Sequence, residues 1–507
     1  MKKIMKLPAL LLAAAIALSV TACAGGKKGN FGEAQTPDID PESPTGTINW
    51  LMYEDLLKNN AKMVALFEER YGGEITQEIT SSGTAYFDRL GTRIATGDSP
   101  DIVRYEWKAF PHGMSYNMFT PLDKYIDLNS ELWADIKDVA EQYSYNGKHY
   151  YVPYQLKTNF ALNYNNAALQ ANGLKDPMEL YQKNEWTWSA FEALLKQWCD
   201  MSPDHIGYNG VGGMSFVLTT GTKTIDIKDG EIINNLRNEN VQRCMTWVED
   251  MRKEGLLGAN ADQVLAGAVS GFVSPDQAFV DGNLLFLGMD PSWAYGTAKQ
   301  YLDEHNVENE IKFVPYPRDD LSDTYYHGVD TYGYMIPSGA PNIKGALDWI
   351  ELNRVEETDE NNIAKAKDDA VSDTVEYFPK CTCGHVFTDE ENESGVSVCP
   401  DCETPRTERY KVVWTEEQYD LWMELRGGEG SRFTLLFDNC YGFGEDLTKL
   451  LQGGDTPILD GPVFHDVNYA NAVESLWNSV EAVIQPYRDR MAADAKGETI
   501  ETTPPAE

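Results

Sequence analysis

The stretch from residue 47 to residue 105 alternates between two hydrophobic periodicities, and this alternation constrains the fold more than any other feature. Residues 47–53 form an apolar run typical of a buried strand, and apolar residues then recur at helical spacing as far as Gly72 and Gly73. The same order repeats over 75–79 and 84–97, and residues 101–105 predict a third strand. Strands separated by helices predict a parallel α/β layer.

In such a layer, ligands bind beyond the carboxyl ends of the strands. This rule places six side chains at the expected binding edge: Tyr53, Glu54, Ser82, Tyr105, Glu106 and Trp107. Further strands are predicted over 150–154, 160–164, 311–316 and 332–336, and further helices over 190–198, 241–253 and 343–352.

The chain begins with a targeting segment. Lys2, Lys3 and Lys6 precede an apolar run over 9–20, which is too short to cross a bilayer of ~30 Å as an ordinary helix. The Val-Thr-Ala-Cys sequence at 20–23 resembles the bacterial lipobox, which implies removal of a signal peptide (1–22) and attachment of a lipid to Cys23. An ordinary cleaved signal is the alternative.

Both ends of the remaining chain are polar. Residues 23–46, which include three prolines, predict a lipidated tether, and residues 491–507 predict a disordered tail. Between them the chain is long enough for two or three domains, and its 42% hydrophobic content is typical of a globular protein. A net charge of -38 argues against binding to nucleic acid or to anionic lipid surfaces.

Four groups of residues, in order along the chain, carry a resemblance to a known family. They are Ile-Ala-Thr-Gly-Asp-Ser-Pro-Asp-Ile-Val at 94–103, the segments 151–165 and 185–191, the segment 278–293 with its Gly-Met-Asp-Pro-Ser-Trp end, and the segments 313–317 and 329–337. Together they resemble the bacterial extracellular solute-binding proteins of carbohydrate ABC importers, the group (family 1) that is similar to maltose-binding protein.

The resemblance implies an α/β protein with two lobes and a hinge, of the type II periplasmic-binding-protein fold. The first lobe would comprise 47–155 and 312–352, and the second 156–311 and 412–490. Such a protein closes on an oligosaccharide and delivers it, unaltered, to a membrane permease. A monomer on the outer face of the cell membrane is therefore expected, held there by its lipid.

The resemblance also implies where the ligand binds. Trp293 matches a tryptophan that stacks on sugar rings, and Tyr105 stands where the family has a tryptophan after a strand. Lys108 and Ala109 replace an Asp-Arg pair of the family, which puts a maltodextrin ligand in doubt. The full set of ligand-contact candidates is Trp293, Tyr105, Glu106, Trp107, Tyr53, Tyr154, Lys157, Asn159, Asp290 and Tyr332.

The cysteines divide into two groups. Cys199, Cys244 and Cys440 are scattered and are interpreted as small buried apolar residues. Four others cluster within a segment at 355–411 that is expected to protrude as an insertion: Cys381, Cys383, Cys399 and Cys402. Their spacing resembles a zinc ribbon and predicts a structural Zn²⁺ site, with His385 as a possible substitute for Cys381. Two disulfides, or iron in place of zinc, are the alternatives.

The sequence contains no His-Glu-x-x-His, Gly-x-Ser-x-Gly or phosphate-cradling motif. A binding protein without catalytic activity is therefore predicted. A lipid-anchored glycoside hydrolase and a solute-binding sensor are the rival functions, and the ligand is an oligosaccharide or another small solute.

Overall fold

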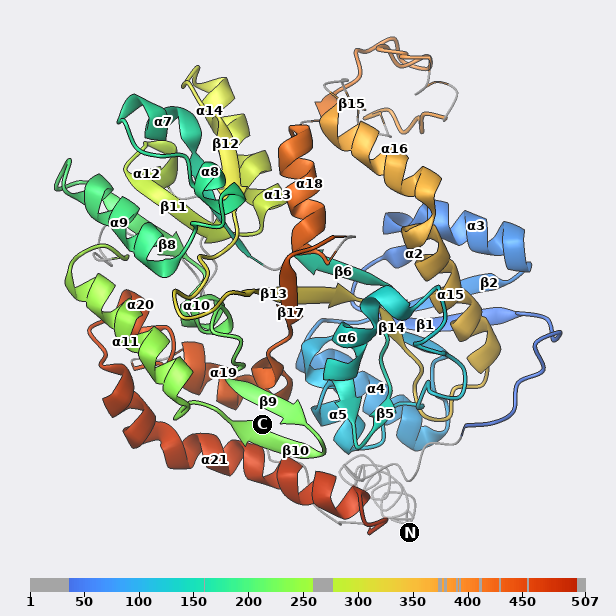
Figure 1. The fold of residues 1–507 in the computed structure, drawn as a ribbon. Helices are drawn as coiled ribbons and strands as arrows, with labels where there is room; N and C mark the ends of the chain where they lie inside the picture. The colour runs from blue at the N-terminus through green and yellow to red at the C-terminus, as the bar shows by residue number, and fades with distance from the viewer. Residues whose placement is uncertain are drawn as a thin grey trace, which may run out of the picture.

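The computed structural model describes residues 36–158, 160–258, 277–372, 376–377, 381–388, 391, 394–409, 413–427, 430–453 and 456–498. The signal peptide and Cys23 lie outside these residues. Two β-sheets with helices packed against them form two lobes, and a third sheet lies between the lobes (Figure 1). The predicted two-lobed α/β fold is confirmed.

The first lobe is built on a four-stranded sheet. Its strands, in spatial order, are β14 (Tyr334–Met335), β3 (Ile102–Arg104), β1 (Thr47–Met52) and β2 (Glu74–Ile79). Its helices include α2 (Leu56–Asn59), α3 (Ala61–Tyr71), α4 (Thr84–Thr96) and α15 (Ile343–Thr358). β1 runs parallel to β2 and β3, as predicted. Gly72 and Gly97 end α3 and α4 in left-handed conformations, with φ of 65° and 73°, which glycine adopts at no steric cost.

The described part of the predicted tether, residues 36–46, lies against the first lobe. Lys124 Nζ donates to the Thr36 carbonyl at 3.0 Å, and the Tyr125 hydroxyl donates to the Pro37 carbonyl at 2.9 Å. Thr45 is buried. The expectation of a free tether is therefore wrong for these residues, because a polar composition does not reveal a surface on which the chain docks.

The second lobe contains the strands β12 (Ile311–Val314), β7 (Ala161–Asn165), β11 (Leu284–Met289) and β8 (Ile206–Gly210), in that spatial order. Its helices include α7 (Asn166–Ala171), α8 (Pro177–Gln182), α9 (Trp188–Cys199), α10 (Gly213–Leu218) and α11 (Glu239–Lys253). β12 pairs with β7 in this sheet. A lobe boundary at 312 would cut that strand, so the chain leaves the second sheet only after Val314.

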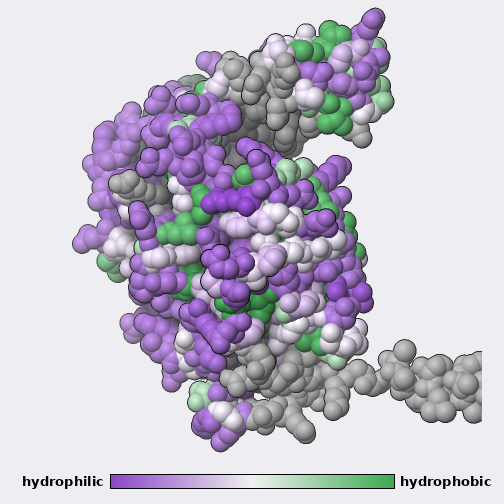
Figure 2. Space-filling view, turned by 90° about the vertical axis from the view of Figure 1, so that its right-hand side faces the viewer, coloured by the Kyte–Doolittle hydropathy of each residue, from purple (hydrophilic) through white to green (hydrophobic). Residues whose placement is uncertain are grey.

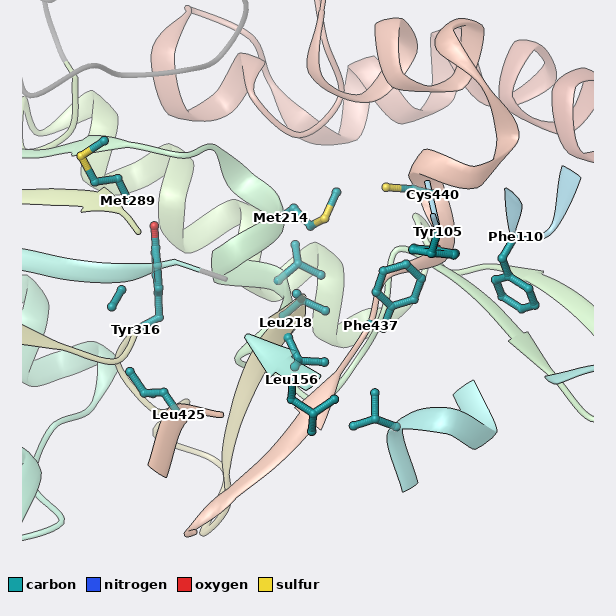
Figure 3. Close-up of a cluster of buried hydrophobic side chains, with 14 of the residues drawn as sticks. Tyr105, Phe110, Leu156, Met214, Leu218, Met289, Tyr316, Leu425, Phe437 and Cys440 are labelled. Atoms are coloured by element: carbon teal, nitrogen blue, oxygen red, sulfur yellow. The ribbon is translucent and has the colours of Figure 1, made fainter. Parts of the chain in front are cut away.

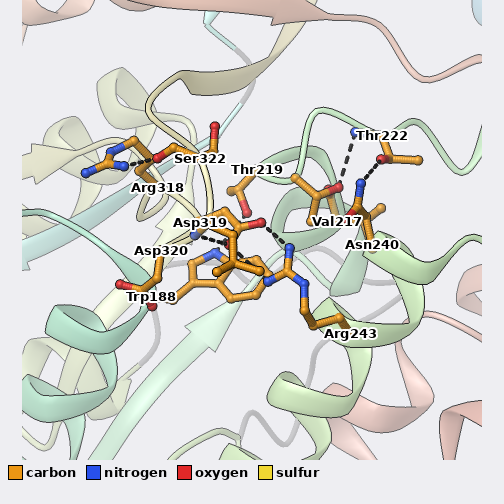
Figure 4. Close-up of polar contacts among 12 residues, drawn as sticks. Trp188, Val217, Thr219, Thr222, Asn240, Arg243, Arg318, Asp319, Asp320 and Ser322 are labelled. Carbon is orange, nitrogen blue, oxygen red and sulfur yellow. Dashed lines mark hydrogen bonds and ion pairs between the residues drawn. The ribbon is translucent and has the colours of Figure 1, made fainter.

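A polar cluster fixes the start of α9 (Figure 4). The Arg243 guanidinium lies 4.8 Å from the centre of the Trp188 ring and pairs with Asp319. The Trp188 ring stacks on Trp247 at 4.4 Å. Because the Arg243 charge is paired with Asp319 and the Trp188 ring is covered by Arg243 and Trp247, we interpret the cluster as a structural feature of the second lobe.

The two lobes are joined through a sheet formed by β17 (Phe433–Leu436), β13 (Tyr325–Tyr332) and β6 (Gln155–Thr158). The strand predicted over 150–154 is displaced to β6, because Pro153 has no N–H to donate to a ladder. Buried side chains form a cluster along this sheet, from Met289 of the second lobe at one side of Figure 3 to Tyr105 of the first lobe at the other. The hinge therefore has a continuous apolar core.

The C-terminal helix α21 (Tyr469–Asp494) packs on both β10 (Glu231–Asn234) and α5 (His112–Ser115). Met491 is buried, and Asp494 accepts a hydrogen bond from Tyr145 at 3.0 Å. The predicted start of the tail at 491 is therefore too early. Among the described residues, none of the helices has the length and apolar character of a membrane span.

The segment predicted as an insertion begins in the last turn of α15, and after a break at Asp359 it forms α16 (Glu360–Val371), which packs on α15 and on α18 (Glu416–Leu425). The predicted start at 355 is therefore too early, because 355–358 complete α15 and 360–371 form α16. The cysteine-rich part stands clear of the main body at the top of Figure 2. It includes a short ladder of β15 (Glu376–Tyr377) and β16 (Glu408–Arg409).

The remaining elements are short. In the first part of the chain they are η1 (Trp107–Ala109), η2 (Ala134–Ile136), α6 (Lys137–Ala140), η3 (Glu141–Tyr143), β4 (Ser144–Tyr145), β5 (Lys148–His149) and β9 (Ile225–Lys228). In the second part they are α12 (Gln277–Val280), α13 (Pro291–Ala294), η4 (Tyr295–Lys299), α14 (Gln300–Glu304), η5 (Asn439–Phe443), α19 (Glu445–Gln452) and α20 (Gly461–Phe464).

Candidate functional site

One face of β13 lies open between the lobes. Along this strand buried residues alternate with half-exposed ones, and the half-exposed ones are Tyr326, Gly328, Asp330 and Tyr332. Lys157 of β6 lies opposite Asp330 in the antiparallel register, so its side chain is on the same face. This face forms the floor of the candidate site.

Trp107 in η1 forms the wall on the side of the first lobe. Its indole stacks on the ring of Tyr441 in η5, with centroids 4.6 Å apart and planes inclined by 31°. The Trp107 side chain also hydrogen-bonds Asp330. Although it is held from two sides, Trp107 remains 46% exposed. An exposed, fixed indole is the group that stacks on the C–H face of a sugar ring.

Arg104, at the end of β3, connects this wall to the floor. Its guanidinium lies 5.6 Å from the centre of the Tyr53 ring and 5.0 Å from that of Tyr332. Arg104 also forms an ion pair with Glu54. The Tyr53 hydroxyl hydrogen-bonds Glu106. Tyr53, Glu106 and Tyr332 therefore lie close together, at the edge of the first-lobe sheet where its strands end.

Asp290, directly after β11, forms the edge on the side of the second lobe. Its carboxylate accepts from the Ser292 N–H at 2.9 Å and lies 3.6 Å from Lys157 Nζ. Trp293 follows in α13. The Trp293 side chain and the whole of Asn159 lie outside the part of the chain that the structure describes. The ion pair joins the hinge to the second lobe at the point where the sequence motif predicts ligand contact.

Burial shifts the pKa values of the acids in this site. It raises the pKa of Glu106, and the hydrogen bond from Tyr53 and the nearby Arg104 oppose that rise. Burial likewise raises the pKa of Asp330, against hydrogen bonds from Thr331 and Trp107 and against the charges of Lys157 and Arg104. A partly buried carboxylate is stabilised in its charged form when a bound molecule brings a hydrogen-bond donor or a cation to it.

Some sequence candidates lie elsewhere. Tyr105 is buried, with its ring stacked on Tyr151 at 4.1 Å, so it belongs to the core and we leave it out of the site. Tyr154 stacks on Tyr334 at 5.7 Å and is mainly a packing residue. Ser82 is exposed.

The sequence reasoning missed three residues of the site: Arg104, Asp330 and Tyr441. The alternation along 325–332 was a signal that could have placed Asp330 on an open face. Nothing in the sequence pairs Tyr441 with Trp107, because their contact is made only in the folded chain.

A small pocket, with space for about one water molecule, lies at the second-lobe end of β13. It is lined by Phe160, Ser215, Leu218, Tyr316, Tyr326, His327 and Gly328. His327 is 3% exposed, and its Nε2 has no hydrogen-bond partner. Burial lowers the pKa of His327 to about 3, so its ring is neutral at physiological pH.

The four clustered cysteines form a candidate metal centre. Their sulfur atoms all lie within 4.8 Å of one another, with Cys381 and Cys402 3.5 Å apart and Cys383 and Cys399 3.7 Å apart. Sulfur atoms that bind one tetrahedral Zn²⁺ at ~2.3 Å are about 3.8 Å apart. All four thiols are free. The residues therefore fit a metal ion.

His385 does not substitute for a cysteine in this arrangement. Its Nδ1 lies 2.9 Å from an Asp401 carboxylate oxygen, and its Nε2 lies 3.4 Å from Glu391. Nearby, Arg406 stacks over the ring of Phe387 at 3.7 Å. The insertion thus has a small apolar contact beside its thiol cluster. Of the three scattered cysteines predicted to be buried, Cys244 and Cys440 are buried, whereas Cys199 is only partly buried.

The sequence from residue 62 to residue 369 matches a family model described as bacterial extracellular solute-binding protein. The chain belongs to this family. Membership confirms the predicted solute-binding role outside the cytoplasm and sets the hydrolase aside. No curated protein matches the chain in a sequence search.

Solved structures of sugar-binding proteins share the fold. The sugar-binding protein MalE from Xanthomonas citri has a TM-score of 0.58 at 16% identity, over 87% of this chain and 98% of its own. The GacH receptor of Streptomyces glaucescens, solved free and with acarbose, has a TM-score of 0.53 at 12% identity over 87% and 98%. The ABC substrate-binding protein Lmo0181 from Listeria monocytogenes, solved with cycloalternan, has a TM-score of 0.52 at 15% identity over 87% and 99%.

Proposed function

We propose that this solute-binding protein is the lipid-anchored receptor of an ABC importer, and that it captures an oligosaccharide between its lobes for delivery to a permease. The observation that carries the proposal is the exposed indole of Trp107, fixed by Tyr441 above the polar floor of β13. The similarly folded MalE and Lmo0181 are described as sugar- or substrate-binding proteins, which supports the same class of ligand. Cys23 would carry the lipid, and the protein would act as a monomer.

The ligand contacts proposed for this function come from both lobes. Tyr53, Glu106, Trp107 and Tyr332 would act from the first-lobe side and Lys157, Asn159, Asp290 and Trp293 from the hinge and second-lobe side. We propose that the first lobe spans 47–155 and 333–358 and that the second spans 160–314 and 413–494. The lobes would close about β6 and β13, and a ligand that bridges them would stabilise the closed form.

A thermal-shift screen of neutral and amino oligosaccharides tests this function. The mature protein should gain several degrees in Tm with at least one oligosaccharide, because a ligand that binds the native state stabilises it. Chromatography should then recover the sugar intact. Trp293→Ala should weaken the binding while it preserves the unliganded Tm. Conversion of the sugar to products would contradict the assignment.

For the cysteine cluster we propose a structural Zn²⁺ site formed by Cys381, Cys383, Cys399 and Cys402. A bound zinc ion would hold the two knuckles of the insertion together, and a site with four thiolates leaves no position for substrate. The mature protein, purified without added metal, should contain about one zinc per chain by elemental analysis. Iron in place of zinc, or two disulfides, would overturn the proposal.

A further inference from the structure

The charged side chains of the candidate site are unbalanced. Its acids are Glu54, Glu106, Asp290 and Asp330, and the cations that act on them are Arg104 and Lys157. Arg104 is paired with Glu54, and Lys157 is paired with Asp290. Within the described residues, the floor and wall of the site therefore carry two more acids than bases.

The two acids left over are Glu106 and Asp330. Glu106 is bonded by the neutral hydroxyl of Tyr53, and Asp330 by the neutral N–H groups of Trp107 and Thr331. The negative charge of Asp330 also raises the pKa of Glu106, because it disfavours a second negative charge nearby. Two neighbouring carboxylates that are partly withdrawn from water are costly unless a positive charge joins them.

The aromatic wall favours the same kind of group. The faces of Trp107 and Tyr441 carry the negative part of the ring quadrupole, and such faces attract cations as well as C–H groups. Since Trp107 also donates to Asp330, its exposed indole lies directly beside the unbalanced acids. A bound molecule could therefore place a cation against the carboxylate and the ring together.

We infer that the site selects a solute with a protonated amine, held between Glu106 and Asp330. Amino-sugar oligosaccharides combine such an amine with the apolar ring faces that Trp107 binds. This inference rests on the proposed function and narrows its ligand class from oligosaccharides in general to those that carry amines.

Three trisaccharides with the same β-1,4 linkage test the inference by isothermal titration calorimetry at pH 6.5. They are the trimers of glucosamine, N-acetylglucosamine and glucose, which differ at one substituent per ring. The glucosamine trimer should bind at least tenfold more tightly than either neutral trimer. Its affinity should fall with added NaCl, whereas that of the neutral trimers should not.

Glu106→Gln and Asp330→Asn keep the size of each side chain and remove its charge. Each should reduce the preference for the glucosamine trimer severalfold, and Glu74→Gln, at an exposed position of β2, should leave it unchanged. Circular dichroism verifies that each variant is folded.

The outcomes separate this inference from the function it rests on. Equal or tighter binding of a neutral trimer, or a preference that survives both substitutions, overturns the amine inference and leaves sugar binding intact. If the glucosamine trimer does not bind but another oligosaccharide raises the Tm, the amine inference is likewise overturned. If no oligosaccharide in the screen binds, the proposed function itself fails.

Discussion

The rings of Trp107 and Tyr441 pack against each other with centroids 4.6 Å apart and planes inclined by 31°, although Trp107 follows the third strand and Tyr441 comes from the last part of the folded chain. Tyr441 thereby fixes the plane and position of an indole that is 46% exposed. A side chain fixed before the ligand arrives loses little conformational entropy on binding. The stack is therefore a preformed surface for a ring-shaped guest.

Replacement of Trp107 by alanine should weaken oligosaccharide binding about tenfold or more, because the stacked face and its contact area are lost. Isothermal titration with the sugar that gives the largest thermal shift measures the change. Leu321→Ala removes a more exposed apolar side chain, 78% exposed, and should leave the affinity unchanged. Wild-type affinity in Trp107→Ala would show that this indole is not a ligand plate.

Gly442 should not tolerate a side chain. A Cβ atom there would lie 1.6 Å from the Phe110 carbonyl oxygen, so Gly442→Ala must push η5 away from the segment after η1. We expect a loss of about 3 kcal/mol in the free energy of unfolding. Urea denaturation measures this loss. Gly453→Ala is the control, because its φ of -119° is allowed for alanine and its nearest contact is 3.3 Å. Equal stability of the two variants would contradict the expected clash.

Asp460 should make stability depend on pH. Burial raises the pKa of Asp460 to about 7, against a hydrogen bond from the Gly213 N–H, whereas its pKa in the unfolded chain is about 4. Between these values the folded state holds a proton that the unfolded state releases, so stability falls as the pH rises from 4 to 7.

Asp460→Asn removes this penalty. The variant should gain stability relative to the wild type as the pH rises through that range, by up to about 4 kcal/mol above pH 7. Parallel urea titrations at pH 5, 6, 7 and 8 measure the difference. Asp204→Asn, at an exposed aspartate, should show no such trend. A constant difference between Asp460→Asn and wild type across the four pH values would refute the assignment.

The metal centre makes a prediction about stoichiometry. Cys383→Ser removes one of the four clustered thiols and should lower the zinc content well below one per chain. Cys199→Ser alters a cysteine outside the cluster and should retain the metal. Limited proteolysis should cut Cys383→Ser faster within 372–412 while the two lobes stay intact. Unchanged zinc content in Cys383→Ser would place the metal elsewhere.

The regular elements of the first lobe could be predicted because their sequence alternates cleanly between strand and helix periods. Trp50 packs on Trp349 at 4.7 Å in the core that this pattern implies. The strand predicted over 150–154 was displaced because apolar content alone does not show which backbone N–H groups can pair. Here Pro153 has none, and the ladder begins at Gln155.

The candidate site was less accessible from sequence than the fold. The expectation that side chains after the strand ends share one edge of the sheet correctly placed Tyr53, Glu106 and Trp107 near one another. It succeeded because the hydrophobic periodicity shows where each strand ends. It could not separate Tyr105 from its neighbours, since adjacent residues after a strand face opposite ways and only packing decides which one is buried. Tyr441 depends on a tertiary contact for which the sequence carries no local sign.

The cysteine-rich segment enters and leaves the body at almost the same point. The Trp414 N–H donates to the Ala370 carbonyl at 2.9 Å, so the two ends of the segment are already joined by a hydrogen bond. A few residues would suffice to connect α16 to α18 directly. The segment is thus a cassette that an engineer could excise, or exchange for a reporter domain, without redesigning the receptor that carries it.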